Sequence, residues 1–185
     1  MFHEAIPGHH LQIAPAQELG LHPVRAENYS VSYGEGRASY AERLADEMGL
    51  YSSPLARLGM LACNSLRACR LVVDTGIHAK GWSRRRAIEF LRDNSAVRLG
   101  VCENEIDRYI AWPGQANAYM VGRLEIERLR RESVEALGSR FQLRELHDVV
   151  LGGGSLPLDT LARRVRAWRA GVDAASRARS PGIDT

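Results

Sequence analysis

Residues 115–137, with the sequence QANAYMVGRLEIERLRRESVEAL, carry the longest helical pattern in this 185-residue chain. The tripeptide Trp-Pro-Gly at 112–114 precedes the segment and Gly138 follows it, so residues that interrupt helices stand at both ends. Charged side chains fill the positions between the apolar ones, as on the solvated face of a helix. The segment therefore predicts a long helix with defined ends.

Helical signals also dominate the sequence on both sides of this segment, and the two-residue alternation of strands is scarce. Only residues 29–33 could form an extended stretch. Pro54 suits the first turn of a long helix, and Ser83 can cap another. The sequence predicts helices over residues 1–19 with a break at Pro7-Gly8, 35–48, 54–76, 84–93, 95–109 and 115–137, and two short helices on either side of 152–154. The expected fold class is all-α, an irregular bundle of about six to eight helices with a zincin-like metal helix at the N-terminus.

The composition, with 45% hydrophobic and 25% charged residues, is that of a globular domain. We expect one helical domain of catalytic type over residues 1–170, followed by a disordered tail over 171–185, which is small, polar and contains proline. A metal-binding helix at the very start of a chain normally needs preceding turns to anchor it. We therefore interpret the chain as the C-terminal part of a larger helical protein, completed by a missing N-terminal half or by a second copy of the chain.

Composition also excludes several functions. No apolar run approaches the roughly 18 residues that span a bilayer, so no membrane span is expected, while the compartment of this soluble domain, cytoplasmic or periplasmic and secreted, stays open. The net charge is only +3, and arginines alternate with glutamates, which argues against nucleic-acid binding. Cys63, Cys69 and Cys102 lack the CxxC spacing of a zinc knuckle, and we interpret them as buried thiols.

Residues 3–10, HEAIPGHH, hold three of the six histidines of the chain. A His-Glu pair followed by further histidines is how helical zinc hydrolases present two ligands and a general base. The usual second ligand stands four residues after the first, but here that position is Pro7. In a straight helix His10 would lie about 10 Å further along the axis than His3. A kink or bulge at Pro7-Gly8 would instead bring His9 to the usual ligand position. His3 and His9 are therefore the favoured ligands, and His10 is the alternative ligand or a hydrogen-bonding partner of one.

Three carboxylates complete the expected metal site. Glu4 directly follows the first ligand, where it can accept a proton from a water molecule activated by the metal, although it also suits a helix N-terminus. Glu35 is the best third ligand, because glycines on both sides of it allow another backbone to approach closely. Glu42 lies two helical turns later on the same face, where it could bond a ligand histidine or, alternatively, pair with arginine at the surface.

Several segments of the chain resemble the bacterial family catalogued as domain of unknown function 885. These segments are residues 3–12 (HEAIPGHHLQ), 34–36 (GEG), 40–44 (YAERL), 67–78 (RACRLVVDTGIH) and 109–116 (YIAWPGQA). The family is similar to gluzincin metallopeptidases, whose third zinc ligand is a downstream glutamate, and residues 35–38 echo the Asn-Glu-Gly-Phe-Ala-type motif of the related aminopeptidases. Its members usually carry an aromatic residue at Arg37 and an aliphatic residue at Ser39, and they extend several hundred residues further on the N-terminal side.

Peptide hydrolysis also needs a group that stabilises the oxyanion formed on the attacked carbonyl. Tyr109, Tyr119 and His78 are candidates, and the resemblance to helical metallopeptidases with a late tyrosine near the metal favours Tyr119. His78 has helix capping as an alternative role. Arg70 could bind the terminal carboxylate of a substrate, but an ion pair with Asp74, four residues later on the same helix, is the simpler interpretation.

The sequence thus predicts a zinc-dependent hydrolase, a metallopeptidase acting on peptides, with Zn²⁺ as its cofactor. His3, His9 and Glu35 would bind the ion. Glu4 would activate water. The alternative is a truncated helical fragment that retains the sequence pattern, performs no chemistry and has a structural or interaction role.

Overall fold

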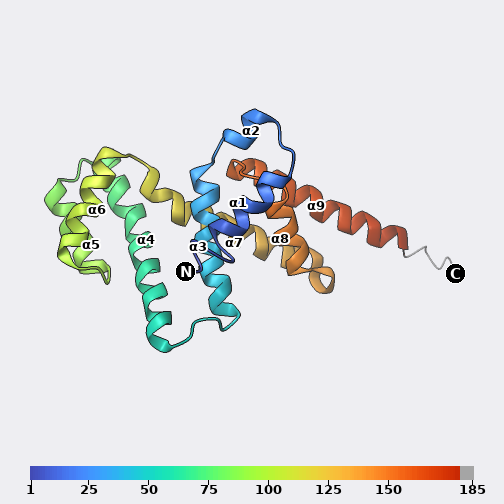
Figure 1. Ribbon diagram of the computed structural model, residues 1–185, viewed down its shortest axis with the longest axis horizontal. Coiled ribbons are helices and arrows are strands. Elements are labelled where there is room, and N and C mark those ends of the chain that lie inside the picture. The colour runs from blue at the N-terminus through green and yellow to red at the C-terminus, as the bar shows by residue number, and fades with distance from the viewer. Residues whose placement is uncertain (180–185) are drawn as a thin grey trace.

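The computed structural model describes residues 1–179, which form nine α-helices, one 3-10 helix and no β-strand (Figure 1). The all-α prediction is confirmed, with one helix more than the upper expected number. No helix in the described range is both long enough and apolar enough to cross a membrane. The elements are α1 (His9–Glu18), α2 (Pro23–Glu27), α3 (Val31–Glu47), α4 (Pro54–Lys80), α5 (Arg84–Asn94), α6 (Leu99–Ala111), α7 (Gln115–Leu137), η1 (Gly138–Arg140), α8 (Leu143–Leu151) and α9 (Leu158–Arg179).

Two apolar clusters build the core, and α7 contributes to both. One cluster joins α4, α5 and α6 and includes Val73, Leu91 and Ile106, and Ala116 adds the start of α7. The other joins α3, the later part of α7, α8 and α9. Figure 1 shows α4, α5 and α6 as a group beside the α3–α7–α8–α9 group, and α7 extends from the first towards the second. The long helix predicted over 115–137 therefore holds the two halves together.

The backbones of helices α3 and α7 approach each other very closely where the two helices cross. A Cβ atom on Gly36 would lie 2.3 Å from the Cα of Gly122, and one on Gly122 would lie 1.8 Å from the carbonyl oxygen of Ser32. Both distances are far below contact range, so this crossing requires glycine on both helices. We expected Gly36 to admit the backbone of the metal-binding segment, but the partner that approaches it is α7.

The structure corrects several predicted boundaries. Residues 31–33 belong to α3 and are not extended. Helix α4 continues past Gly76, and that glycine packs against the ring of Trp82. The helix ends before Gly81, whose φ of 64° is the left-handed conformation of a helix C-cap. Gly76 therefore allows an aromatic ring to pack against the helix, whereas Gly81 ends the helix.

The C-terminal boundary also differs from the expectation. The last helix, α9, is long rather than short and continues through Arg179, so the disordered tail expected from Gly171 is helical over 171–179. Residues 180–185 lie outside the described part of the chain. All three cysteines are free; Cys69 and Cys102 are buried as expected, whereas Cys63 is exposed.

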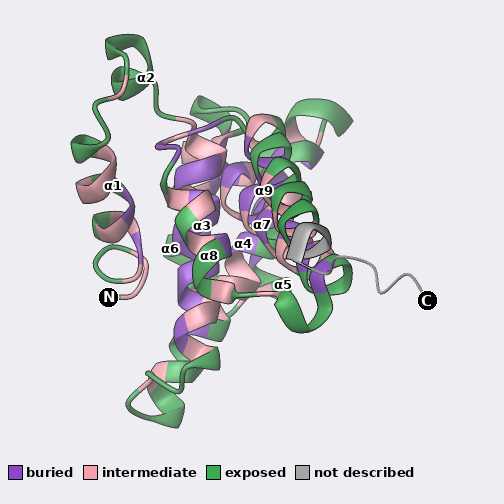
Figure 2. Cartoon of the chain, turned by 90° about the vertical axis from the view of Figure 1, so that its right-hand side faces the viewer, coloured by how far each residue is buried: buried purple, intermediate pink, exposed green. Residues whose placement is uncertain are grey.

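The N-terminal elements lie on the outside of the bundle. Figure 2 shows α1 and α2 to one side of the buried surfaces of α3 and α7, with exposed residues along much of their length. The principal buried side chain of α1 is Gln12. This arrangement places the histidine segment against α3, the helix that carries Glu35 and Glu42.

Candidate metal centre

A turn, rather than a continuous helix, brings His3 and His9 together. The backbone N–H of His9 donates to the carbonyl oxygen of His3 at 2.8 Å, and that of His10 donates to Glu4 at 2.9 Å, so the turn closes over six residues instead of four. The peptide bond between Ile6 and Pro7 is cis. The two imidazole rings lie edge to face with their centroids 4.9 Å apart. The predicted break at Pro7-Gly8 therefore exists, and His9 takes the position near His3.

Two neighbours hold this turn in place. A Cβ atom on Gly8 would lie 1.9 Å from the carbonyl oxygen of His3, so only glycine fits the turn. Arg37, on α3, is 7% exposed, and its Nη1 donates to the carbonyl oxygen of Gly8 at 2.7 Å and to that of Pro7. The arginine that departs from the family's usual aromatic residue thus binds the two carbonyl groups at the break.

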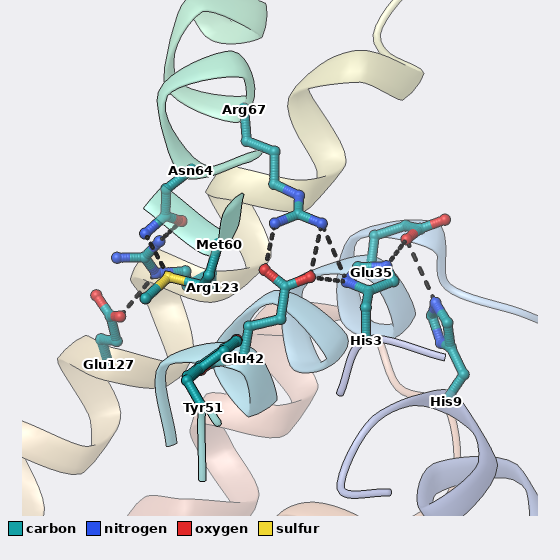
Figure 3. A network of polar contacts seen from close by, with 10 residues as sticks. All are labelled: His3, His9, Glu35, Glu42, Tyr51, Met60, Asn64, Arg67, Arg123 and Glu127. Atoms are coloured by element: carbon teal, nitrogen blue, oxygen red, sulfur yellow. Dashed lines mark hydrogen bonds and ion pairs between the residues drawn. The ribbon is translucent and has the colours of Figure 1, made fainter. Parts of the chain in front are cut away.

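Glu35 lies between the two histidines. Its Oε2 is 3.2 Å from Nε2 of His3 and 3.5 Å from Nε2 of His9 (Figure 3). Donor atoms that bind one tetrahedral zinc ion at about 2.0–2.2 Å lie roughly 3.3–3.6 Å from one another. Burial alone would raise the pKa of Glu35, but the contacts with His3 and His9 outweigh it and lower the pKa to about 2. The carboxylate is therefore ionised, as a metal ligand must be.

Glu42 and Arg67 support His3 from the opposite side. Oε1 of Glu42 lies 3.0 Å from Nδ1 of His3, and both Nη atoms of Arg67 donate to the same carboxylate (Figure 3). Nη2 of Arg67 is also 3.2 Å from Nδ1 of His3. All three side chains are largely buried. A carboxylate behind a histidine is the usual way in which a ligand imidazole is oriented.

Glu4 belongs to the same cluster and His10 does not. Potential ligand atoms of His3, Glu4 and His9 lie within 4.8 Å of one another, although Glu4 itself is exposed. His10 is exposed, and within residues 1–179 the ion pairs of Glu35 are with His3 and His9. The structure therefore brings His9, the favoured of the two alternatives, to His3 and Glu35.

Two tyrosines border the cluster. The ring of Tyr119 is nearly parallel to that of His3, with 6.1 Å between centroids, and its hydroxyl accepts a hydrogen bond from Gln115. The hydroxyl of Tyr29 packs against Gly34, the residue before Glu35. Burial and the charge of Glu35 raise the pKa of the Tyr29 hydroxyl. Tyr119 lies where it was predicted, whereas Tyr29 was assigned no role from the sequence.

Arg70 is bound inside the fold rather than paired with Asp74. Its Nε donates to the hydroxyl of Tyr109 at 2.8 Å and its Nη2 donates to Glu105 at 2.7 Å. Asp74 instead accepts from the backbone N–H of Gly114 at 3.0 Å and from the amide of Asn117 at 2.9 Å, and so caps the start of α7. The preferred Arg70–Asp74 pair is therefore wrong, and a substrate carboxylate would have to displace Glu105 to bind Arg70.

His78 and Tyr109 lie away from the cluster. Nε2 of His78 is 3.0 Å from the backbone oxygen of Tyr109, and eleven residues of α4 separate His78 from Arg67, a rise of about 16 Å. The hydroxyl of Tyr109 is occupied by Arg70 and Glu105. Of the three candidates for oxyanion stabilisation, the structure brings only Tyr119 to the histidines.

The residue types at this site fit a zinc ion. Two imidazoles and one carboxylate form the donor set of many catalytic zinc sites, with a fourth position left for water or substrate. Three carboxylates and one guanidinium give the residues around the two imidazoles a net charge of −2, which suits a divalent cation. Nδ1 of His9 is buried without a hydrogen-bond partner among the described residues. A metal bound at Nε2 would leave this nitrogen without a partner.

The fold and site define a helical protein with a candidate two-histidine, one-glutamate metal centre. Residues 1–165 match the family described as bacterial protein of unknown function (DUF885), and the chain belongs to this family. A search of the curated proteins found no match.

Two solved structures show how far the fold is shared. One is described as "the putative lipoprotein from Colwellia psychrerythraea"; it is 42% identical, superposes with a TM-score of 0.89 and is matched over 92% of this chain. The other, "a putative lipoprotein of unknown function from Shewanella oneidensis", is 29% identical over 88% of this chain, with a TM-score of 0.82. This chain spans only 29% and 30% of the lengths of those two proteins.

The sequence did not predict that Arg37 and Tyr29 lie beside the candidate metal centre. It drew attention to Arg67 but not to the contact of that residue with Glu42. Arg37 was noted only as a departure from the family, and Tyr29 was read as part of an extended stretch. Arg67 was visible in a stripe with Arg70 and Asp74, but the sequence could not show that Glu42 is its partner. A buried arginine such as Arg37 or Arg67 needs an acceptor from elsewhere in the chain, and which group supplies that acceptor depends on how the helices pack.

Proposed function

We propose that this chain forms the metal centre of a zinc-dependent hydrolase, a metallopeptidase that acts on peptides. His3, His9 and Glu35 would hold the ion. The observation that carries the proposal is the position of Oε2 of Glu35, which lies within 3.2 and 3.5 Å of two imidazole nitrogens. These distances match the spacing of donors around one tetrahedral ion.

A zinc ion held by these ligands would supply a Lewis acid that polarises both water and the carbonyl of the scissile bond. Glu4, adjacent to the first ligand and exposed, would accept the proton of the attacking water and deliver it to the leaving amine. The hydroxyl of Tyr119 would donate to the carbonyl oxygen as negative charge develops there. His78 is omitted from this scheme because of its position.

Glu42 and Arg67 would act through His3. With Nδ1–H directed at Glu42, the imidazole presents a lone pair on Nε2, the form that binds a metal. Arg67 fixes both carboxylate oxygens and balances the charge of Glu42. Glu42 and Arg67 would thus hold His3 in the tautomer that the proposed chemistry needs.

Zinc binding gives the direct test. We would measure zinc affinity by competition with a chromophoric chelator for the chain, His9→Ala and the matched control His10→Ala. The proposal expects about one zinc per chain, loss of binding in His9→Ala and unchanged binding in His10→Ala. Less than about a tenth of an equivalent of zinc in the original chain, or equal effects of the two substitutions, would contradict it.

Hydrolysis is tested on the zinc-loaded chain with short peptides whose ends are free or blocked. The proposal expects cleavage that stops when a chelator is added and that is lost in Glu4→Gln with zinc still bound. Cleavage that persists in both cases would be inconsistent with the assigned roles. Because the chain spans less than a third of its two solved relatives, the same assay on one of those proteins completes the test.

A further inference from the structure

A second site adjoins the candidate metal centre. A cleft of about 180 Å³ lies between α1, α2 and the segment that enters α3, next to Ser155. Polar and aliphatic side chains both line it, and the polar ones include Gln12, Arg25 and Tyr29. Pockets that take drug-sized ligands measure roughly 300–1,000 Å³, so this cleft is suited to a single side chain.

The cleft is connected with the proposed zinc ligands through α1 and through Tyr29. Gln12 lies three residues after His9 on α1, which places it on the same helical face. Tyr29 rests on Gly34, the neighbour of Glu35 on α3. A peptide whose scissile bond lies at the histidines would therefore have a flanking side chain beside this cleft.

Gln12 is the residue that indicates a ligand. It is only 4% exposed, and although its side chain bonds the hydroxyl of Tyr29, its Oε1 is buried without a hydrogen-bond partner among the described residues. A buried carbonyl without a donor is destabilising, and native structures rarely retain one without a reason. A ligand with an N–H group in the cleft would satisfy this oxygen.

Arg25 supplies the complementary chemistry. Its Nη2 donates to the backbone oxygen of Gly153, which anchors the side chain across the cleft. A guanidinium carries five N–H donors, so the same side chain can serve an additional acceptor. The cleft thus combines an unsatisfied acceptor with a cationic donor.

We propose that this cleft is a substrate subsite for a carboxamide side chain, that of asparagine or glutamine. The amide NH₂ would donate to Oε1 of Gln12 and the amide oxygen would accept from Arg25. A carboxylate offers no hydrogen for Gln12, and an aliphatic side chain would leave Oε1 of Gln12 unpaired and offer no acceptor to Arg25. This inference rests on the proposed function, because it makes the cleft part of the peptide-binding site.

The test is an NMR titration of the full chain, with and without added zinc, using N-acetylated Ala-Gln-Ala, Ala-Glu-Ala and Ala-Met-Ala. The glutamine peptide should shift the resonances of Gln12 and Tyr29 and bind about ten-fold more tightly than the other two. Gln12→Met, which keeps the length of the side chain, should remove this preference. Gln142→Met, at an exposed glutamine outside the cleft, should retain it.

Equal affinity for the three peptides overturns the inference without any variant, as does an undiminished preference in Gln12→Met. The zinc arm separates this inference from the proposed function. Zinc binding without a preference for the glutamine peptide contradicts the subsite alone. A preference for that peptide in a chain that binds no zinc contradicts the proposed hydrolase and leaves carboxamide recognition standing.

Discussion

Arg67 and Arg70 lie one turn apart on α4, both are buried, and each binds a glutamate from another helix. Their networks nevertheless differ. The Arg67 network leads through Glu42 to His3, whose other ring nitrogen faces Glu35 (Figure 3). The Arg70 network closes on Glu105 and Tyr109. A buried Arg–Glu pair alone therefore does not identify a functional site; what distinguishes the first network is that it continues to the histidines and to Glu35.

The largest effect on zinc affinity is expected from a substitution of Glu35. Glu35→Gln keeps the size of the side chain but removes the charge that two imidazoles share, so zinc affinity should fall by more than about 100-fold, beyond the effect of losing a supporting residue. Competition with a chromophoric chelator measures the change. A variant that binds zinc as well as the original chain would exclude Glu35 as a ligand.

Arg70→Met should lower the stability of the fold and leave zinc affinity nearly unchanged. Glu105 would keep Arg108 and Tyr109 as partners but lose its buried bond to Arg70, so the free energy of unfolding should fall by about 1–3 kcal/mol. Urea denaturation measures this, and zinc affinity should stay within about two-fold. Arg84→Met, which removes the exposed pair with Asp107, is the matched control and should cost less than about 1 kcal/mol. A loss of zinc binding in Arg70→Met would remove the contrast between the two networks.

Glu42→Gln should reduce zinc affinity by about 10- to 100-fold, because His3 loses the carboxylate that orients it. Glu47→Gln, on the same helix but in an exposed pair with Arg130, is the control and should bind zinc normally. The same titration compares both variants. If Glu42→Gln matched its control, the role of Glu42 would be confined to folding.

The smallest effect concerns acid stability. Burial alone would raise the pKa of Glu105, but hydrogen bonds from Arg108, Tyr109 and Arg70 outweigh it and lower the pKa from 4.5 to about 2. The unfolded chain then binds more protons than the folded one as the pH falls from 4.5 towards 2, so this contribution to stability is lost in that window. Urea midpoints measured against pH should fall less steeply for Glu105→Gln than for the original chain. Parallel profiles would contradict this assignment.

Much of the fold was predictable from local signals. The helix over 115–137 has interrupting residues at both ends, and its observed bounds agree with the prediction. Errors arose where tertiary contacts decide the outcome. Gly76 resembled a helix end but packs under Trp82, and residues 31–33 resembled a strand but begin α3.

The candidate site divides in the same way. The sequence indicated that His3, His9 and Glu35 lie close together. Proline at the usual ligand position predicted a break that brings His9 to His3, and the glycines on both sides of Glu35 indicated a close approach of two segments. The partners of buried charges did not follow, since Arg37 reaches a turn 29 residues earlier and Arg67 reaches a different helix. Such pairs depend on the packing of helices, which no local pattern encodes.

The most direct test of the central claim is anomalous diffraction at the zinc edge from crystals of the chain grown with zinc. We predict one peak about 2.0–2.2 Å from Nε2 of His3, Nε2 of His9 and a carboxylate oxygen of Glu35. A zinc ion bound elsewhere, or no peak among these three side chains, would contradict the account.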